Sequence, residues 1–265
     1  MPGGRIDRGV GRNIFGLDAA GYHAARLGYP DELYAEVLDR AGGDVRAIVE
    51  IGAGTGLATG PLFGPRIERY VAVEPDPILS DYLRTGFAGR PIEVVNEDFV
   101  TASISGTFNL VAAASSFHWL DAVPAMARIR ALLRPGGCAA IWWNAYRNPG
   151  MGDPFADATM PLLHGIDLPP SESTCGHYSL DADLHIARFA AAGFARIEQR
   201  VFRRERTLTA AGARALYASY SFVRALPDDR RGSLLAAIGD LVDRDFGGLA
   251  PNVVLTALYF ASAPA

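Results

Sequence analysis

The residues with the clearest chemical potential are a glycine-rich stretch, residues 49–56, and a carboxylate that follows it, Glu74. The stretch continues an apolar run that begins at Val45, and Glu74 ends the next apolar run, residues 70–73. Glycines let a backbone pass close to a ligand, and a carboxylate accepts hydrogen bonds from ribose hydroxyl groups. The pattern predicts a strand, a glycine turn, a helix and a second strand that bind the adenosine part of a nucleotide-like cofactor.

The glycine spacing distinguishes between two kinds of cofactor. A dinucleotide site has the pattern G-x-G-x-x-G, in which the third glycine lets the helix pack on the strand. Here the glycines are Gly52, Gly54 and Gly56, and Gly60 lies too far along the chain. The acidic residue Glu50 is also out of place for a dinucleotide. The spacing therefore disfavours a nicotinamide-dependent oxidoreductase, which we keep as an alternative.

The elements that must position these residues alternate along the chain. We expect strands at residues 45–51, 70–74, 92–95, 108–114, 138–143, 194–202 and 253–261. Helical patterns separate them, at residues 31–41, after 76–77, at 122–133 and at 181–192. Such alternation implies a parallel sheet with right-handed crossovers, an α/β fold.

The second half of the chain breaks this rhythm. Residues 146–180 hold five prolines and little periodicity, so we interpret them as an insertion over the active site. We divide the chain into an N-terminal arm with a lid helix (1–30), a cofactor-binding core (31–145), and lid segments with the final strands of the same sheet (146–265). Together they form a single domain overall.

Composition excludes several classes of function. The net charge is −4 and no long block of like charge is present, which argues against a nucleic-acid partner. No apolar run approaches the roughly 20 residues that a membrane helix needs. The two cysteines, Cys138 and Cys175, have neither metal nor disulfide spacing, so we expect a reduced, cytoplasmic protein. Every basic residue is an arginine, and a lysine base or nucleophile is therefore ruled out.

Several motifs together resemble class I S-adenosylmethionine-dependent methyltransferases, in the type 11 group near the trans-aconitate methyltransferase-like enzymes. The resemblance runs from about Phe15 to the C-terminus. Leu27 departs from the group, which usually has proline there. The supporting motifs are Tyr22-x-x-x-Arg26-x-x-Tyr29-Pro30, Glu50-x-Gly52-x-Gly54-x-Gly56, Val73-Glu74-Pro75-Asp76, Asp98-Phe99, Ser116-Phe117-His118-Trp119 and Leu133-Arg134-Pro135-Gly136-Gly137.

The resemblance implies a doubly wound, Rossmann-like, mostly parallel seven-stranded sheet with an antiparallel last strand and a late helical lid. It also implies S-adenosylmethionine as cofactor, with S-adenosylhomocysteine as product. On the methionine side of the cofactor we expect the backbone of Gly52, Ala53, Gly54 and Gly56, a charged contact of Glu50 to the amine or sulfonium, and Ser115 near the amine. We expect Tyr22 and Arg26 to lie over the methionine carboxylate. Glu74 would bind the ribose, and Pro75, Asp98 and Phe99 would surround the adenine.

Three of these residues also have ordinary alternative interpretations. Asp98 could shape a turn, and Arg26 and Tyr22 could lie on the surface of a helix.

His118 is the candidate catalytic residue. It follows the fourth strand, at the edge where open α/β sheets bind their ligands. A neutral imidazole can remove a proton from an acceptor near pH 7, or it can only position the substrate. A carboxylate acceptor needs no base, only alignment. We expect no metal site, and we expect His185 on the surface of its helix.

Aromatic and amide side chains predict a pocket for a small, partly apolar substrate. The candidates are Trp119, Trp143, Asn144, Tyr146, Tyr217 and Tyr220. Core packing is the alternative for each aromatic residue. We therefore predict a monomeric or homodimeric methyltransferase that O-methylates a carboxylate or hydroxyl of a small molecule, without a nucleic-acid or membrane partner. The alternative of a different kind is a non-catalytic protein that binds S-adenosylmethionine or S-adenosylhomocysteine.

Overall fold

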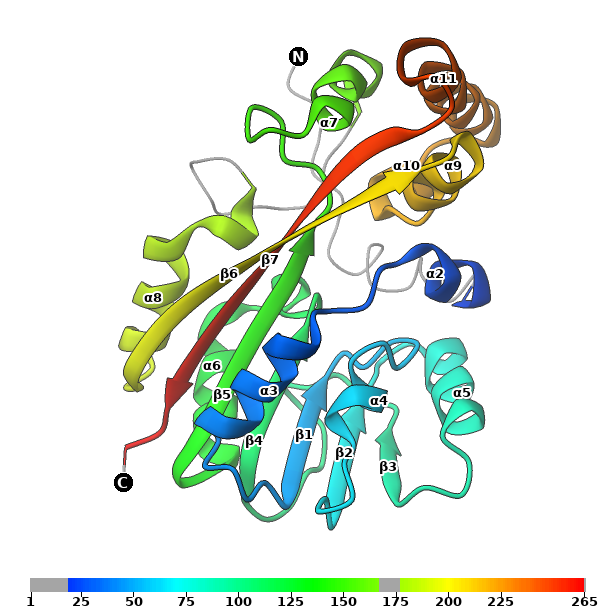
Figure 1. Ribbon diagram of the computed structural model, residues 1–265. Helices are drawn as coiled ribbons and strands as arrows, with labels where there is room; N and C mark the ends of the chain where they lie inside the picture. The colour runs from blue at the N-terminus through cyan, green and yellow to red at the C-terminus, as the bar shows by residue number, and fades with distance from the viewer. Residues whose placement is uncertain (1–18, 167–176, 265) are drawn as a thin grey trace. The chain divides into compact units, whose positions relative to one another are not determined.

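The structure, a computed structural model, describes residues 19–166 and 177–264 (Figure 1). The prediction for Cys175 lies outside these residues. The described chain divides into two compact units. Unit 1 contains residues 19–27, 145–166 and 203–255, and unit 2 contains residues 28–144, 177–202 and 256–264.

Seven strands form one mixed sheet in the order β3-β2-β1-β4-β5-β7-β6 (Figure 1). Six strands are parallel and β7 runs antiparallel to both of its neighbours, which confirms the predicted fold class. The strands are β1 (Ala47–Ile51), β2 (Arg69–Val73), β3 (Ile92–Val95), β4 (Phe108–Ala114), β5 (Leu133–Ala145), β6 (Ala195–Leu208) and β7 (Ala250–Ser262).

The first strands match their predicted bounds closely, whereas the last three are longer. β5 begins at Leu133 because the pairing with β4 resumes beyond an irregularity between Phe108 and Leu110. β6 continues past Phe202 through a charged stretch in which exposed and half-buried residues alternate. That alternation is the period of a strand, although the apolar residues that usually reveal a strand are missing.

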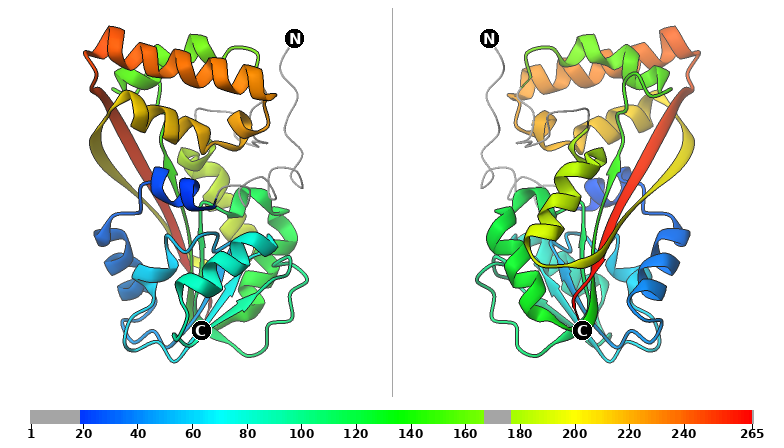
Figure 2. Two further views of the ribbon diagram at one scale, coloured as in Figure 1. Left: turned by 90° about the vertical axis from the view of Figure 1, so that its right-hand side faces the viewer. Right: turned by 90° about the vertical axis from the view of Figure 1, so that its left-hand side faces the viewer.

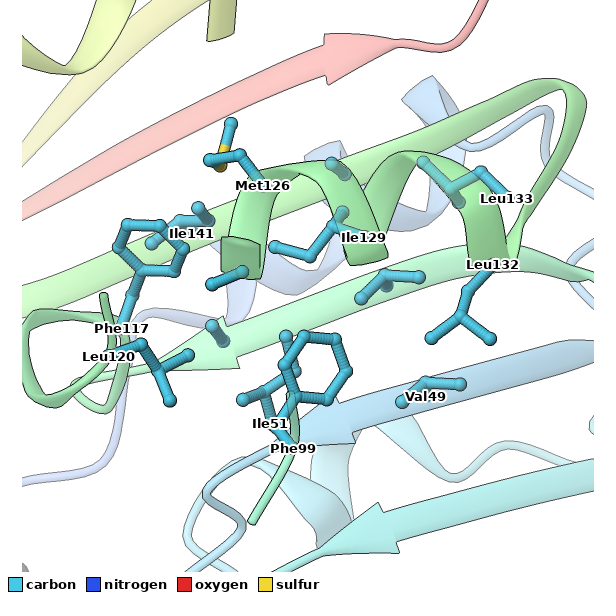
Figure 3. Packing of buried hydrophobic residues seen from close by; sticks show 14 of the residues in the cluster. Val49, Ile51, Phe99, Phe117, Leu120, Met126, Ile129, Leu132, Leu133 and Ile141 are labelled. Atoms are coloured by element: carbon cyan, nitrogen blue, oxygen red, sulfur yellow. The ribbon is translucent and has the colours of Figure 1, made fainter. Parts of the chain in front are cut away.

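Unit 2 buries both faces of β1, β2 and β4, and these strands are accordingly mostly apolar. Val49 and Ile51 of β1 point to the face that is covered by α6 (Ala122–Leu132) and α8 (Ala182–Ala191) (Figure 3). Ile48 points to the opposite face, which is covered by α3 (Asp31–Arg40), α4 (Thr59–Leu62) and α5 (Pro77–Gly86).

The helices of unit 2 begin at side chains that satisfy their free backbone N–H groups. Asp76 accepts hydrogen bonds from the N–H groups of Ile78 and Leu79 at the start of α5, and Pro77 takes the first helical position. Asp121 and Asp181 cap α6 and α8 in the same way. Two short 3-10 helices, η2 (Phe117–Trp119) and η4 (Tyr178–Leu180), also belong to this unit.

Unit 1 is a helical unit with its own apolar core. Its elements are α2 (Ala19–Ala25), α7 (Pro154–Thr159), η3 (Met160–Leu163), α9 (Ala210–Ala218), α10 (Ser221–Arg224) and α11 (Asp228–Phe246). Helices α9 and α11 lie side by side (Figure 2), and they contribute Leu216 and Ile238 to the buried core of this unit. Among the described residues, no helix combines the length and the apolar character that crossing a bilayer requires.

Candidate active site

The loop between β1 and α4 carries the three glycines, and the surroundings of each glycine differ. All three have positive φ, at 62°, 58° and 83°, a region that favours glycine. A Cβ atom on Gly52 would lie 2.5 Å from Cβ of Ser116, beyond β4. A Cβ atom on Gly56 would lie 2.5 Å from the ring of Phe87, after α5. At Gly54 a Cβ atom would meet nothing closer than 4.0 Å, which leaves its backbone open to a ligand.

Glu74 follows β2 and holds the glycine loop in place. Its Oε2 accepts a hydrogen bond from the N–H of Gly54 at 2.8 Å, and its Oε1 accepts one from the N–H of Asp76 at 3.0 Å. Each carboxylate oxygen has two lone pairs, so one acceptor position on each oxygen remains for a ligand. Two vicinal hydroxyl groups match this arrangement, which is the contact that we predicted for a ribose.

The Glu74 carboxyl is 5% exposed, and this burial raises its pKa to about 7. The two backbone N–H groups oppose the shift because they stabilise the charged form, and the negative charge of Asp76 adds to it. The ionisation of Glu74 is therefore poised near neutral pH.

Glu50 lies beneath the loop, with 1% of its surface exposed. Its Oε2 accepts hydrogen bonds from the hydroxyl groups of Thr59, at 2.6 Å, and Tyr70, at 2.5 Å. Burial raises its pKa to about 7, and the negative charge of Glu74 contributes. Through these two hydroxyl groups Glu50 ties α4 to β2, and its contact with a cationic group of the cofactor stays a prediction.

Polar residues after β3 support the end of β2. The Nδ2 of Asn96 donates to the carbonyl oxygens of Glu74, at 2.9 Å, and Pro75, at 3.0 Å. Asp98 accepts a hydrogen bond from the N–H of Val100 at 2.9 Å, so it has the turn-forming role that we considered as an alternative. The ring of Phe99 is buried in the core. The adenine contacts predicted for Pro75, Asp98 and Phe99 stay predictions.

The end of β4 is strained and is fixed by hydroxyl groups. Ser115 has a positive φ of 53°, which is unusual for a residue other than glycine and is common at functional sites. Tyr29 donates its hydroxyl hydrogen to Oγ of Ser115 at 3.0 Å, and Ser116 donates to the carbonyl oxygen of Ile51. Since β1 to β4 are parallel, their following residues Gly52, Glu74, Asn96 and Ser115 lie at one edge of the sheet, where such sheets bind ligands.

His118 lies on η2, half-buried, and contacts the side chain of Trp143. The Nε1–H of Trp143 donates to Nδ1 of His118 over 3.2 Å. An indole nitrogen is only a donor, so Nδ1 must accept, and a neutral His118 carries its proton on Nε2. The ring also packs against Trp119 and Tyr178, with centroid distances of 4.6 and 5.2 Å.

His185 corrects one of our predictions. It is 2% exposed, and its Nε2 lies 3.0 Å from the carbonyl oxygen of Tyr178, so it is a core residue of unit 2. Its ring lies 4.8 Å from that of Trp143 and 4.5 Å from that of Tyr259. The position on α8 was clear from the sequence, but the partner strand that covers it comes much later in the chain.

Three predicted pocket residues have structural partners. Asn144 accepts from the hydroxyl of Thr256 at 2.6 Å and donates to the carbonyl oxygen of Gly28 at 3.3 Å, which links β5 with β7 and the segment before α3. Trp119 is buried against His118. Trp143 is buried in the core of unit 2, with only its N–H edge directed at His118.

The remaining candidates belong to unit 1. Arg26 donates to the carbonyl oxygen of Ser219 at 3.0 Å and lies over the rings of Tyr22, Tyr146 and Tyr220. Tyr217 is buried and donates to Thr159 at 2.7 Å, so packing, the alternative that we kept for the aromatic residues, describes it here.

Two residues were not singled out from the sequence: Asn96, which supports the end of β2, and Arg206, whose Nε donates to Oδ1 of Asn252 at 3.0 Å. Asn96 directly follows an apolar strand, and a polar residue in that position is a usable signal. Arg206 lies in the charged part of β6, where only the period of two marks it. Within the described residues, no three His, Cys, Asp or Glu side chains gather closely enough to hold a metal ion.

Comparison with known proteins adds to this geometry. Residues 49–141 match the family model of the type 11 methyltransferase domain. A methyltransferase-like protein of Schizosaccharomyces pombe, itself uncharacterised, is 27% identical over 239 residues, 86% of this chain and 85% of its own length. An uncharacterised methyltransferase of Mycobacterium tuberculosis is 30% identical over 136 residues, 49% of this chain and 51% of its own.

Solved structures share the fold at low identity. A protein from Anaeromyxobacter dehalogenans, provisionally assigned as a type II methyltransferase, has a TM-score of 0.65 at 19% identity and covers 90% of this chain and 97% of its own. The phosphoethanolamine N-methyltransferase 2 of Haemonchus contortus, solved with S-adenosylhomocysteine, has a TM-score of 0.55 at 12% identity, over 96% of this chain and 60% of its own. Residues 49–141, which include the glycine loop and Glu74, form a methyltransferase domain, and this match supports a class I S-adenosylmethionine-dependent methyltransferase with that cofactor.

Proposed function

We propose that this methyltransferase transfers the methyl group to an oxygen atom of a small-molecule acceptor, with a carboxylate favoured over a hydroxyl. The observation that supports an acceptor without a removable proton is the hydrogen bond from Trp143 to His118. It occupies the nitrogen that would have to accept a proton, so His118 is suited to donate a hydrogen bond through Nε2–H rather than to act as a base.

The cofactor supplies an electrophilic methyl group, and this chain supplies the binding surface. Gly54 leaves its backbone open, and Glu74 keeps two acceptor positions for the ribose. We retain Gly52, Ala53, Gly56, Pro75, Asp98, Phe99 and Ser115 as predicted contacts around them. Tyr22 and Arg26 remain the predicted contacts of the methionine carboxylate, since a guanidinium pairs well with a carboxylate.

In this proposal His118 positions the acceptor. A carboxylate is ionised at neutral pH, and the transfer then depends on alignment of the reacting oxygen with the methyl group. The burial of Trp143 fixes the orientation of the imidazole, because an indole held in the core cannot follow a ring that rotates. Trp119 and Tyr178 restrict the ring on its sides.

The same proposal covers the partners and the compartment. The net charge of −4 and the absence of a long basic block in the sequence support a small acceptor over a nucleic acid. We propose a monomeric or homodimeric protein of the cytoplasm, which the sparse cysteine content supports.

The first test is calorimetric titration of the purified protein with S-adenosylhomocysteine, with the reduced nicotinamide cofactor as a control. We expect binding of the first compound alone. Transfer of tritium from methyl-labelled S-adenosylmethionine to small carboxylic acids and phenols then tests the acceptor class. Labelling of phenols but not of acids would contradict the carboxylate preference, and labelling of neither, despite binding, would favour a non-catalytic binding protein.

A further inference from the structure

Unit 1 contains a group of cationic and aromatic side chains that we call the arginine–tyrosine cluster. Its members are Arg26, Tyr146, Arg147, Arg206, Tyr220 and Phe222. The guanidinium carbon of Arg26 lies 5.0 Å from the ring centroid of Tyr146 and 4.8 Å from that of Tyr220. Arg206 lies 5.6 Å from the Tyr146 ring, and Arg147 lies 5.5 Å from the Phe222 ring. Three positive charges therefore gather around a few aromatic rings.

The cluster contains buried polar atoms without hydrogen-bond partners in the part of the chain that the structure describes. The hydroxyl group of Tyr220 is one, on a side chain that is only 7% exposed. The Nη2 of Arg206 and the Nε of Arg147 are two more. A buried donor without a partner is destabilising by about 1–3 kcal/mol, so native proteins rarely retain several of them together without a ligand.

Two arginines of the cluster, Arg147 and Arg206, also have no ion pair in the described part of the chain. The Nε of Arg206 donates to Oδ1 of Asn252 at 3.0 Å, and only the amide of Asn252 reaches a carboxylate, Asp153, at 3.4 Å. Burial lowers the pKa of Arg206, and the positive charge of Arg26 lowers it further. Arg206 is half-buried, and cations that are withdrawn from water in this way are normally paired.

We propose that the arginine–tyrosine cluster binds the carboxylate group of a small organic acid. The planar guanidinium group matches a carboxylate with two parallel hydrogen bonds, and the Tyr220 hydroxyl offers a further donor. The rings of Tyr220 and Phe222 are stacked, with centroids 5.2 Å apart and an interplanar angle of 16°, and they suit an apolar or aromatic body attached to that carboxylate. The identification of this acid as the methyl acceptor rests on the proposed function, whereas the binding site itself does not.

The test uses benzoate as the probe, with neutral benzamide and inorganic phosphate for comparison, on the full chain without cofactor and at constant ionic strength. We expect benzoate to raise the melting temperature and to give a measurable calorimetric affinity, and benzamide to do neither. Arg206→Gln should weaken benzoate binding about tenfold, the effect of losing one charge-assisted hydrogen bond. Arg203→Gln is the matched control, because Arg203 lies on the same strand, is exposed and pairs with Glu205.

Stability without a ligand separates a binding role from a structural one. If Arg206 serves an anion, the unliganded Arg206→Gln variant loses little more stability than Arg203→Gln, since the substitution removes a half-buried charge without an ion pair together with only one hydrogen bond, to Asn252, and the contact with the Tyr146 ring. A large loss of stability in Arg206→Gln alone, or equal binding of benzoate by both variants, would overturn the proposal. Binding of phosphate but not benzoate would make the cluster an inorganic anion site and would also overturn it. Failure of the cofactor titration would affect the proposed function and leave this result standing.

Discussion

Replacement of Glu74 by glutamine offers the sharpest test of the cofactor site. The carboxylate uses one acceptor position on each oxygen for the N–H groups of Gly54 and Asp76, and two positions remain. Glutamine keeps one oxygen, so Glu74→Gln retains about half of these contacts. The loss of one charge-assisted ribose contact should weaken S-adenosylhomocysteine binding by about 1.5 to 3 kcal/mol, or about 10- to 150-fold in Kd.

The pH dependence provides a second, independent measure of the same contact. Burial raises the pKa of Glu74 to about 7, and only the ionised carboxylate accepts hydrogen bonds at both oxygens. Binding should therefore strengthen as the pH rises through 7. At pH 6, about one unit below this pKa, ionisation requires about 1.4 kcal/mol, so Kd should be about tenfold weaker than at pH 8.

Calorimetric titrations at pH 6 and pH 8 on three proteins would decide the matter. The wild type should show the pH dependence and Glu74→Gln should bind weakly at both values, whereas Glu50→Gln should keep the pH dependence of the wild type. Glu50 is the matched control because it is equally buried and its pKa is also raised to about 7, yet its carboxylate faces Thr59 and Tyr70. A wild-type Kd that is constant over this range, or equal damage in both variants, would refute the reasoning.

Three further predictions concern stability and the imidazole. Gly52→Ala should unfold at a lower urea concentration than Gly43→Ala. Both positions have positive φ, but only a Cβ atom on residue 52 would meet a side chain at 2.5 Å, a clash that destabilises by about 1–3 kcal/mol. Equal unfolding midpoints would show that the loop shifts to relieve the clash. The raised pKa of Glu50 means that the folded state holds this proton more tightly than the unfolded state, so its contribution lowers wild-type stability by up to about 3 kcal/mol as the pH rises from about 4.5 to about 7. Urea titrations at both ends of that range should show a smaller decline in Glu50→Gln, and an identical decline would contradict the assignment. Nitrogen NMR of the labelled histidines should find the His118 proton on Nε2 in the wild type and a mixture of both tautomers in Trp143→Phe; a proton on Nδ1 in the wild type would exclude the hydrogen bond from Trp143.

The parallel strands were predictable because their signal is local. The run from Phe108 to Ala114 is apolar at every position but Asn109, as a strand covered on both faces requires, and the structure has the same bounds. Glu74 was predictable for the same reason, since a carboxylate that ends an apolar strand after a glycine loop has one obvious place in this fold.

Other residues depend on partners that are distant in sequence. Glu50 accepts a hydrogen bond from the hydroxyl group of Tyr70, which lies on the neighbouring strand β2. No local sequence pattern predicts that pair. His185 is buried because Tyr259, on the last strand, packs against its ring. The part of β6 beyond Phe202 was not predicted because arginine and glutamate alternate there in place of the apolar residues that usually mark a strand. The long arginine side chains can cover apolar surface without appearing as hydrophobic residues in the sequence.

The hydrogen bond between Gly54 and Glu74 has a consequence for rates. Because this bond and the close approach of Gly52 to Ser116 are made by atoms of the protein itself, the chain holds the glycine loop in shape through its own contacts. Little conformational freedom is then left for the loop to lose on association. The association rate should therefore not be limited by ordering of the loop. Differences in affinity among loop variants should appear mainly in the dissociation rate.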